Sequence, residues 1–290
     1  MPRRREIARR TQTFTGMTHG HALWLAERRL TTWQRPVVEA SSLAQRALET
    51  RLAFALIDAF PESVQVPGYP WAIAQAIPAG ASLDLYPAPG AESRLLAGLL
   101  PRKERGSRGP SSGAYGLRGE PSSPGWWTLS DLESGAYVRV AASPLCDPAA
   151  VAATDGNALI TLPRVTTAER MTPRYLNTVA RRARPGWLEH RDVMGSRLLR
   201  RPGLLNMLAR PRGATHIYTH GARDIIIELC EAQPTLPDAY RWLRASGLTA
   251  PGDDIDVRAP RSLPAGYFSA HMDIGHAHLC LQHNQFPSTG

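Results

Sequence analysis

The segment 172–201, TPRYLNTVARRARPGWLEHRDVMGSRLLRR, combines helix signals with a dense set of arginines. Thr172 suits the N-cap of a helix and Pro173 suits its first position. Pro185-Gly186 then interrupts the pattern, because neither residue favours a helix interior. The sequence therefore predicts a helix in two pieces over Pro173–Arg201.

The first helical piece has two chemically different faces. One face is aliphatic and the other is polar and basic, at spacings of three and four residues. The aliphatic face carries Leu176, Val179, Ala180 and Ala183, and the basic face carries Arg174, Asn177, Arg181 and Arg184. We expect this helix to pack by its aliphatic side and to present guanidinium groups, whose planar forks suit phosphate oxygens.

The positive charge of the chain is concentrated around this segment. Between Arg170 and Arg212 there are eleven arginines, no lysine, and two acids, Glu189 and Asp192. This local surplus of nine equals the formal net charge of the whole chain, +9, so the remaining residues sum to zero. A field of this kind indicates a polyanionic partner. The alternative is a solvated helix face neutralised by acids elsewhere in the fold.

The predicted nucleic-acid-binding residues follow from this pattern. They are Arg174, Asn177, Arg181, Arg182, Arg184, Arg191, Arg197, Arg200 and Arg201. RNA is favoured over duplex DNA, because arginine-rich helices recognise the shape and phosphates of structured RNA. The strand predicted at 223–229 carries no aromatic residue, so we expect the helices to make the contact.

The elements around the arginine segment alternate in an ordered way. Apolar runs and turn residues predict strands at 157–162, 214–219, 223–229 and 254–258, a second helix at 237–246, and a terminal hairpin over 266–282. The resulting β-α-β-β-α-β order is the ferredoxin-like plan. The expected fold class is α+β, with a C-terminal ferredoxin-like unit bearing arginine-rich helices.

The N-terminal half predicts a smaller α/β unit. Residues 1–10 are interpreted as a disordered basic arm, and residues 41–60 as a helix followed by two strands at 71–77 and 81–86. Residues 101–125 are rich in Gly, Ser, Pro and Arg. We therefore expect domains at 1–100 and 126–290 with a flexible linker at 101–125 between them.

Composition and motifs indicate which cellular compartment and which cofactors are expected for the protein. The three cysteines, Cys146, Cys230 and Cys280, are widely spaced and odd in number, which argues against a disulfide framework and for a reducing cytoplasm. No apolar run is long enough for a membrane span, so no membrane association is expected. Phosphate-loop, dinucleotide-binding and serine-nucleophile motifs are missing, and no cofactor is predicted.

Histidines supply the candidates for chemistry. His190 is the predicted catalytic residue, because it lies inside the arginine segment, where guanidinium groups would lower its pKa and stabilise charge on a reacting phosphate. The alternative is a surface histidine that only contacts phosphate. A separate hypothesis places a metal on His271, Asp273, His276 and His278 near the C-terminus. The favoured prediction includes no metal.

The arginine-rich stretch Arg174–Arg201 and the segment Ile274-Gly275-His276-Ala277, on a ferredoxin-like plan, resemble the CRISPR repeat-RNA processing endoribonucleases. That family has tandem ferredoxin-like domains that grip an RNA hairpin and cleave it without metal. The resemblance covers at most the C-terminal half. No second glycine cluster follows Ala277, and no histidine matches the catalytic position of the family.

The favoured function is therefore a structured-RNA-binding protein of a ribonucleoprotein complex with other protein subunits. Metal-independent cleavage of a guide RNA is the accompanying enzyme hypothesis. Two alternatives stay open at this point. One is a non-catalytic DNA-binding subunit or replication factor that contacts duplex phosphates, and the other is a metal-dependent enzyme that uses the C-terminal histidines.

Overall fold

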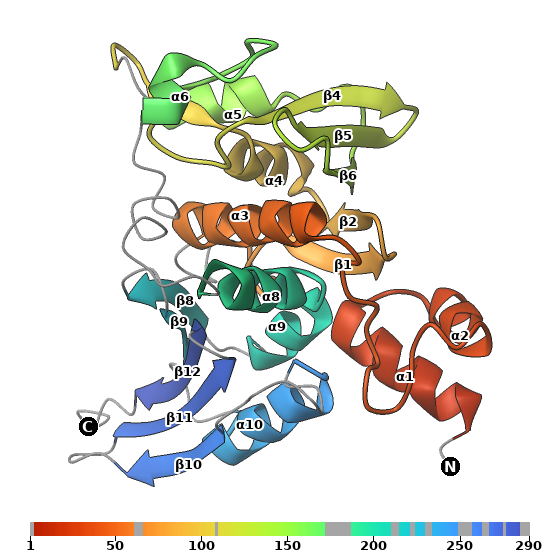
Figure 1. Ribbon diagram of the computed structural model, residues 1–290. Helices are drawn as coiled ribbons and strands as arrows, with labels where there is room; N and C mark the ends of the chain where they lie inside the picture. The colour runs from red at the N-terminus through yellow and green to blue at the C-terminus, as the bar shows by residue number, and fades with distance from the viewer. Residues whose placement is uncertain are drawn as a thin grey trace.

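The structure is a computed structural model with an α+β fold, which confirms the expected class. It describes residues 3–60, 66–107, 110–171, 187–209, 215–220, 224–229, 234–248, 257–262, 267–274 and 277–284. Two five-stranded sheets lie on opposite sides of a group of helices (Figure 1). Within the described residues, no helix has the length and apolar character needed to cross a membrane.

The helices and strands have the following bounds. The helices are α1 (Arg4–Thr15), α2 (His19–Glu27), α3 (Leu43–Ala59), α4 (Glu92–Leu99), α5 (Pro148–Thr154), α6 (Thr167–Met171), α8 (Trp187–Leu199), α9 (Pro202–Leu208) and α10 (Leu236–Ala245). The strands are β1 (Ile73–Pro78), β2 (Leu83–Pro87), β3 (Arg102–Glu104), β4 (Leu117–Ser123), β5 (Trp126–Asp131), β6 (Tyr137–Ala141), β7 (Asn157–Leu159), β8 (Thr215–His220), β9 (Asp224–Leu229), β10 (Val257–Ser262), β11 (Tyr267–Ile274) and β12 (Ala277–Asn284).

Both large sheets are mixed. The first sheet has the strand order β1-β2-β6-β5-β4, and the second has the order β10-β11-β12-β9-β8. Each contains one parallel pair, β2 with β6 and β12 with β9, while the other neighbours are antiparallel. A short antiparallel pair, β3 with β7, stands apart from both sheets.

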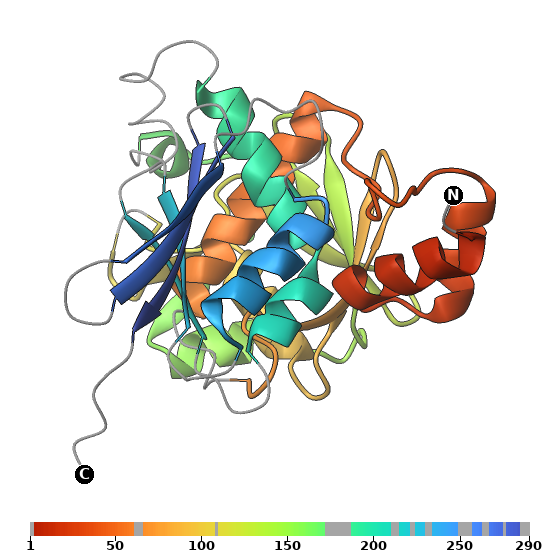
Figure 2. The same ribbon diagram turned by 90° about the horizontal axis from the view of Figure 1, so that it is seen from below.

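Helices fill the space between the two sheets, as Figure 2 shows. The central helix α3 packs along α8 and also contacts β6 of the first sheet and β8 of the second. The two helices approach closely at Gly195, where a Cβ atom would lie 2.7 Å from the Thr50 side chain. One hydrophobic core therefore runs through both sheets and the helices between them.

The predicted helix at 41–60 is confirmed as α3. The Ser42 side chain caps it by accepting a hydrogen bond from the Gln45 amide at 3.1 Å. Leu48, Leu52 and Leu56 are fully buried at helical spacing. The predicted strands at 71–77 and 81–86, the helix at 237–246 and the C-terminal hairpin are also present, as β1, β2, α10, β11 and β12.

Residues 101–125 are not a linker. They contain β3 and β4, and β4 forms the edge of the first sheet beside β5. Its residues Glu120–Ser123 are all exposed, so this end of the strand contributes no side chain to the core. The polar composition of this edge strand led to the wrong prediction.

The expected division at 1–100 and 126–290 is also wrong. The first sheet draws β1 and β2 from one side of the predicted boundary and β5 and β6 from the other. Leu52 of α3 and Leu198 of α8 belong to the same core cluster as Ile227 of β9. The two predicted units share one core because α3 is covered from both sides.

The predicted first strand of the β-α-β-β-α-β unit belongs elsewhere. Asn157–Leu159 pairs with Arg102–Glu104 and not with the second sheet. The reason is local, because α5, which directly precedes β7, packs against α4 and so holds the next strand near β3. The second sheet is formed instead by β8, β9, β10, β11 and β12, with α10 between β9 and β10.

Candidate nucleic-acid interface

The predicted binding residues divide into three groups in the structure. Arg174, Asn177, Arg181, Arg182 and Arg184 lie outside the described residues. His190 and Arg191 belong to α8, but their side chains lie outside the described part. Arg197, Arg200 and Arg201 are described fully, at the end of α8 and the start of α9.

Arg200 is fully buried and its hydrogen-bonding capacity is saturated. Its Nε and Nη2 groups donate to the two carboxylate oxygens of Glu49 at 2.7 and 2.5 Å. Its Nη1 group donates to the carbonyls of Val38 and Ala79, each at 2.8 Å, and Nη2 also reaches the Ser82 carbonyl at 3.4 Å. All five N–H groups of the guanidinium therefore have partners inside the protein.

Arg201 and Arg197 form a second buried group around Glu39. Arg201 is fully buried and donates to a Glu39 carboxylate oxygen at 2.5 Å and to the Ser246 carbonyl at 3.0 Å. Burial lowers the pKa of Arg201, although Glu39 opposes that shift. Arg197 is 9% exposed and donates to the Leu248 carbonyl at 2.8 Å.

These three arginines correct the predicted interface. A guanidinium that is buried and hydrogen-bonded to protein cannot meet a phosphate without breaking those bonds. Arg197, Arg200 and Arg201 instead tie α8 to α3, to the 38–39 segment and to the end of α10. Part of the arginine surplus around 170–212 is thus a structural ion-pair network, and its acidic partners lie far away in sequence.

An exposed basic surface is found at the N-terminus, where a disordered arm was predicted. Residues 4–15 form α1, which packs against α2 around a small core of Ala8, Met17, Ala22, Leu25 and Ala26. This helical pair protrudes from the body of the molecule (Figures 1 and 2). Packing of these apolar residues orders the basic segment as a helix, and α1 also contacts α9 and β1.

Arg10 fastens the helical pair to the C-terminal end of α10. Its Nε donates to the Ala245 carbonyl at 2.8 Å, where the helix dipole favours a cation. The same guanidinium lies over the Trp33 ring at 4.3 Å from its centroid. Partial burial lowers the pKa of Arg10. Arg10 therefore positions the α1–α2 pair as a fixed part of the surface.

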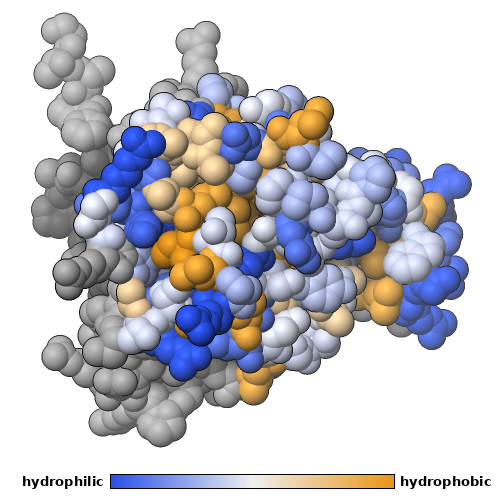
Figure 3. All heavy atoms as spheres, turned by 90° about the horizontal axis from the view of Figure 1, so that it is seen from above, coloured by the Kyte–Doolittle hydropathy of each residue, from blue (hydrophilic) through white to orange (hydrophobic). Residues whose placement is uncertain are grey.

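Seven further arginines form what we call the N-terminal arginine surface. They are Arg4, Arg5, Arg9, Arg28, Arg29, Arg35 and Arg244, all exposed. Over residues 3–35 eight arginines stand against Glu6 and Glu27 alone. Among the described residues, the seven form no salt bridge with an acid. Figure 3 shows hydrophilic side chains at the end of the molecule where α1 and α2 lie. Such a surface attracts polyanions.

Two tryptophans accompany these arginines. Trp24 is 47% exposed and Trp33 is 44% exposed, although both are large aromatic residues. The Arg28 guanidinium lies 4.5 Å from the centroid of the Trp24 ring, an i, i+4 pair at the end of α2. Exposed aromatic rings beside arginines are typical of surfaces that bind nucleic acid by stacking and charge. In the sequence, the spacing of four residues between Trp24 and Arg28 is the feature that could have indicated this surface.

The structure gives little support to the hypothesis of a metal site on the C-terminal histidines. Asp273 and His278 are paired across β11 and β12, while His276 lies outside the described residues. Within the described part of the chain, no group of three or more metal-ligating side chains is present. The metal-dependent alternative therefore has no described ligand set.

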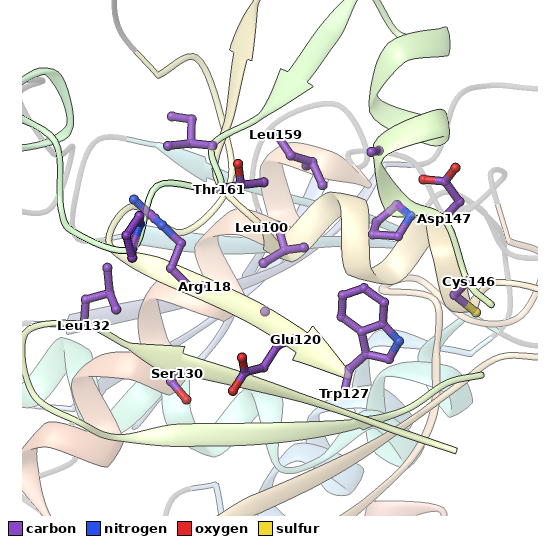
Figure 4. A pocket seen from close by; sticks show the side chains of 15 residues that line it. Leu100, Arg118, Glu120, Trp127, Ser130, Leu132, Cys146, Asp147, Leu159 and Thr161 are labelled. Atoms are coloured by element: carbon purple, nitrogen blue, oxygen red, sulfur yellow. The ribbon is translucent and has the colours of Figure 1, made fainter. Parts of the chain in front are cut away.

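A cavity of about 520 Å³ lies along the edge strand β4 (Figure 4). Its walls include Leu100, Trp127 and Leu159, and Arg118 and Glu120 lie at the β4 side. Arg118 donates to Glu169 at 2.8 and 3.0 Å, and the remaining donors of its guanidinium bond to backbone carbonyls. Its charge is therefore already neutralised, which makes the cavity a poor receptor for phosphate.

Glu169 holds this part of the fold as a carboxylate. Burial alone raises its pKa, but hydrogen bonds from Arg118 and from the amides of Thr166 and Gly116 outweigh burial and lower the pKa to about 2. The side chain of Glu169 is fully buried. The Arg118–Glu169 pair therefore links α6 to β4 and has a structural role.

In comparisons with family models, with curated proteins and with solved structures, nothing matched this chain.

Proposed function

We propose that the protein binds nucleic acid, with structured RNA as the favoured ligand, and serves as a subunit of a cytoplasmic ribonucleoprotein complex. The observation that carries the proposal is the N-terminal arginine surface. Its seven exposed arginines and two half-exposed tryptophans lie on the folded helical pair, on the loop that follows α2, and on the adjoining end of α10.

The physical basis is the difference between buried and exposed arginines. The buried arginines at 197, 200 and 201 are paired with Glu39 and Glu49, whereas over residues 3–35 eight arginines stand against only two acids in sequence. Unneutralised charge of one sign repels itself and favours a counter-charged ligand. Phosphate groups supply that counter-charge at regular intervals.

RNA is favoured over duplex DNA for two reasons. Aromatic rings can stack on bases only where those bases are unpaired, and such bases occur in RNA loops and ends. The surface is also built from helices and a loop, which suit contacts with an irregular backbone. The alternative, a DNA-binding subunit, would use the same arginines on duplex phosphates.

Equilibrium binding of a labelled RNA hairpin tests the proposal. We expect Arg4→Glu/Arg5→Glu/Arg9→Glu to weaken binding at least about tenfold, because each lost phosphate contact also restores a counterion. The matched control is Lys103→Glu/Arg105→Glu/Arg164→Glu, which reverses three exposed charges elsewhere and should bind almost normally. Equal binding by wild type and the α1 variant would refute the proposal. Competition with duplex DNA at the same salt concentration separates the RNA and DNA alternatives.

Cleavage by His190 stays a hypothesis, because its side chain lies outside the described residues. Incubation of the hairpin in EDTA tests metal-independent cleavage. If wild type cuts the hairpin and His190→Ala does not, His190 takes part in the reaction. Uncut RNA with both proteins would limit the function to binding.

A further inference from the structure

We propose that the outward face of the first sheet is a stacking platform for unpaired nucleobases. The inference rests on the proposed function and deepens it, because it assigns a second surface of the same molecule to the bases. The platform is formed by Tyr86 of β2, Arg139 and Tyr137 of β6, and Trp126 of β5.

Strand register places these residues on one face. Alternation along the strands buries Leu83, Leu85, Val138, Val140 and Leu129 on the side of α3. The intervening residues face away from that core. Two cross-strand pairings align them, Asp84 with Arg139 across β2 and β6 and Trp126 with Ala141 across β6 and β5. The small Ala141 of β6 therefore lies between the aromatic side chains of Tyr86 and Trp126, which belong to the two strands that flank β6.

The aromatic side chains are arranged with a fixed geometry. The rings of Tyr86 and Trp126 meet edge to face, with centroids 5.4 Å apart and planes at 79°. The Arg139 guanidinium lies 4.8 Å from the centroid of the Trp126 ring. Arg139 is held in turn by Asp84, with its Nε donating to Oδ1 at 2.7 Å. The platform is therefore ordered before any ligand arrives, which lowers the entropic cost of binding.

The platform is accessible. Tyr137 is 40% exposed, the Arg139 side chain is 44% exposed, and Tyr86 and Trp126 are half-buried. The residues between the aromatic side chains are small or polar, including Thr128, Ser130 and Ala141. A face of flat rings and small polar residues suits bases, which stack on aromatic rings and arginine.

The platform is continuous with the N-terminal arginine surface. Ile77 of β1 is paired with Asp84 on the same face, and it packs against the core of the α1–α2 pair. Figure 2 shows the first sheet between α3 and the side on which α1 and α2 protrude. A strand of nucleic acid could therefore place phosphates on the arginines and unpaired bases on the sheet.

The test compares two single strands with the same number of phosphates, an oligouridine and an abasic strand of equal length. We expect wild type to bind the oligouridine about tenfold more tightly or better, because stacking of even one base contributes an effect of this size. Tyr86→Leu/Trp126→Leu should lower this preference about threefold or more, because two stacking rings are lost while Trp24 and Trp33 remain. Tyr86→Phe/Trp126→Phe should retain it, since the rings remain.

Tyr115→Leu is the matched control, because Tyr115 is a half-buried tyrosine beside Asp58 at the end of α3. Equal affinity of wild type for both strands would overturn the platform, and this comparison needs no variant to fold. A folded double-leucine variant that keeps the preference would also overturn it. If wild type binds neither of the two single strands nor the hairpin, the proposed function is overturned as well. Failure of the platform and failure of nucleic-acid binding are therefore distinguishable.

Discussion

Arg200 shows how burial changes the role of an arginine. The Glu49 carboxylate that pairs with Arg200 also accepts hydrogen bonds from Gln45 at 2.9 Å and from Ser196 at 2.5 Å. Glu49 lies in α3 between the buried Leu48 and Leu52. A buried carboxylate is costly unless it is paired and hydrogen-bonded, and Arg200 supplies that partner from the end of α8.

Removing the charge of Arg200 should destabilise the protein strongly. Arg200→Met leaves Glu49 buried and unpaired, and we expect a loss of about 3–5 kcal/mol in the free energy of unfolding. Urea denaturation measures this loss. The exposed Arg105→Met serves as the control, with an expected change below about 0.5 kcal/mol. A change for Arg200→Met as small as that of the control would contradict the structural role.

Glu169 gives the stability of the protein a defined pH dependence. Its pKa is about 2 in the fold against an ordinary value of 4.5, so its contribution to stability is present above pH 4.5. That contribution is lost as pH falls through the range between these values. We expect Glu169→Gln to lower the free energy of unfolding by roughly 2 kcal/mol at neutral pH. The difference from wild type should shrink as pH falls below 4.5; a constant difference would contradict the assignment.

At the scale of elements, sequence patterns predicted the helices and strands whose formation depends on residues within the element itself. The helix α3 and the strands β1 and β2 were predicted because capping, periodicity and turn residues lie within each segment. The edge strand β4 was missed because its pairing with β5 orders a stretch that has few apolar residues. The helix α1 was missed because its high charge obscured Ala8 and Phe14, whose burial depends on α2 and the core.

The docking of α1 depends on close backbone contact with α9. A Cβ atom at Gly203 would lie 2.3 Å from the Thr13 carbonyl oxygen. Gly203→Ala should therefore displace α1, although alanine favours the helical conformation of α9. We expect faster proteolysis within residues 4–15 and weaker RNA binding, with Gly20→Ala, which meets no neighbour, as the control. Unchanged proteolysis would show that α1 is not held by this contact.

At the scale of the whole molecule, the two sheets depend on one another through α3. A fragment of residues 126–290 lacks β1, β2, β4 and α3, and it loses one wall of the core around α8. We expect this fragment and the fragment 1–100 to show no cooperative thermal unfolding when expressed separately, while the full chain unfolds cooperatively. A cooperative transition for either fragment would contradict the single-core description.

The charge distribution of the whole molecule could be predicted only in part. The count of arginines indicated a polyanionic partner, but counting does not distinguish a guanidinium in an ion-pair network from one in solvent. Arg200 and Arg9 have the same charge and opposite surroundings, and only long-range contacts with Glu49 decide the difference. The proposed interface therefore lies on the N-terminal helical pair and not at the end of α8, where the arginines are buried.

The salt dependence of RNA-hairpin affinity tests the central claim most directly. For wild type, the logarithm of the binding constant should fall steeply and linearly with the logarithm of salt concentration. For Arg4→Glu/Arg5→Glu/Arg9→Glu, we expect a slope smaller by about two or more, because three phosphate contacts are lost. The Lys103→Glu/Arg105→Glu/Arg164→Glu control should keep the wild-type slope. Identical slopes for wild type and the α1 variant would contradict the claim that these arginines hold phosphate.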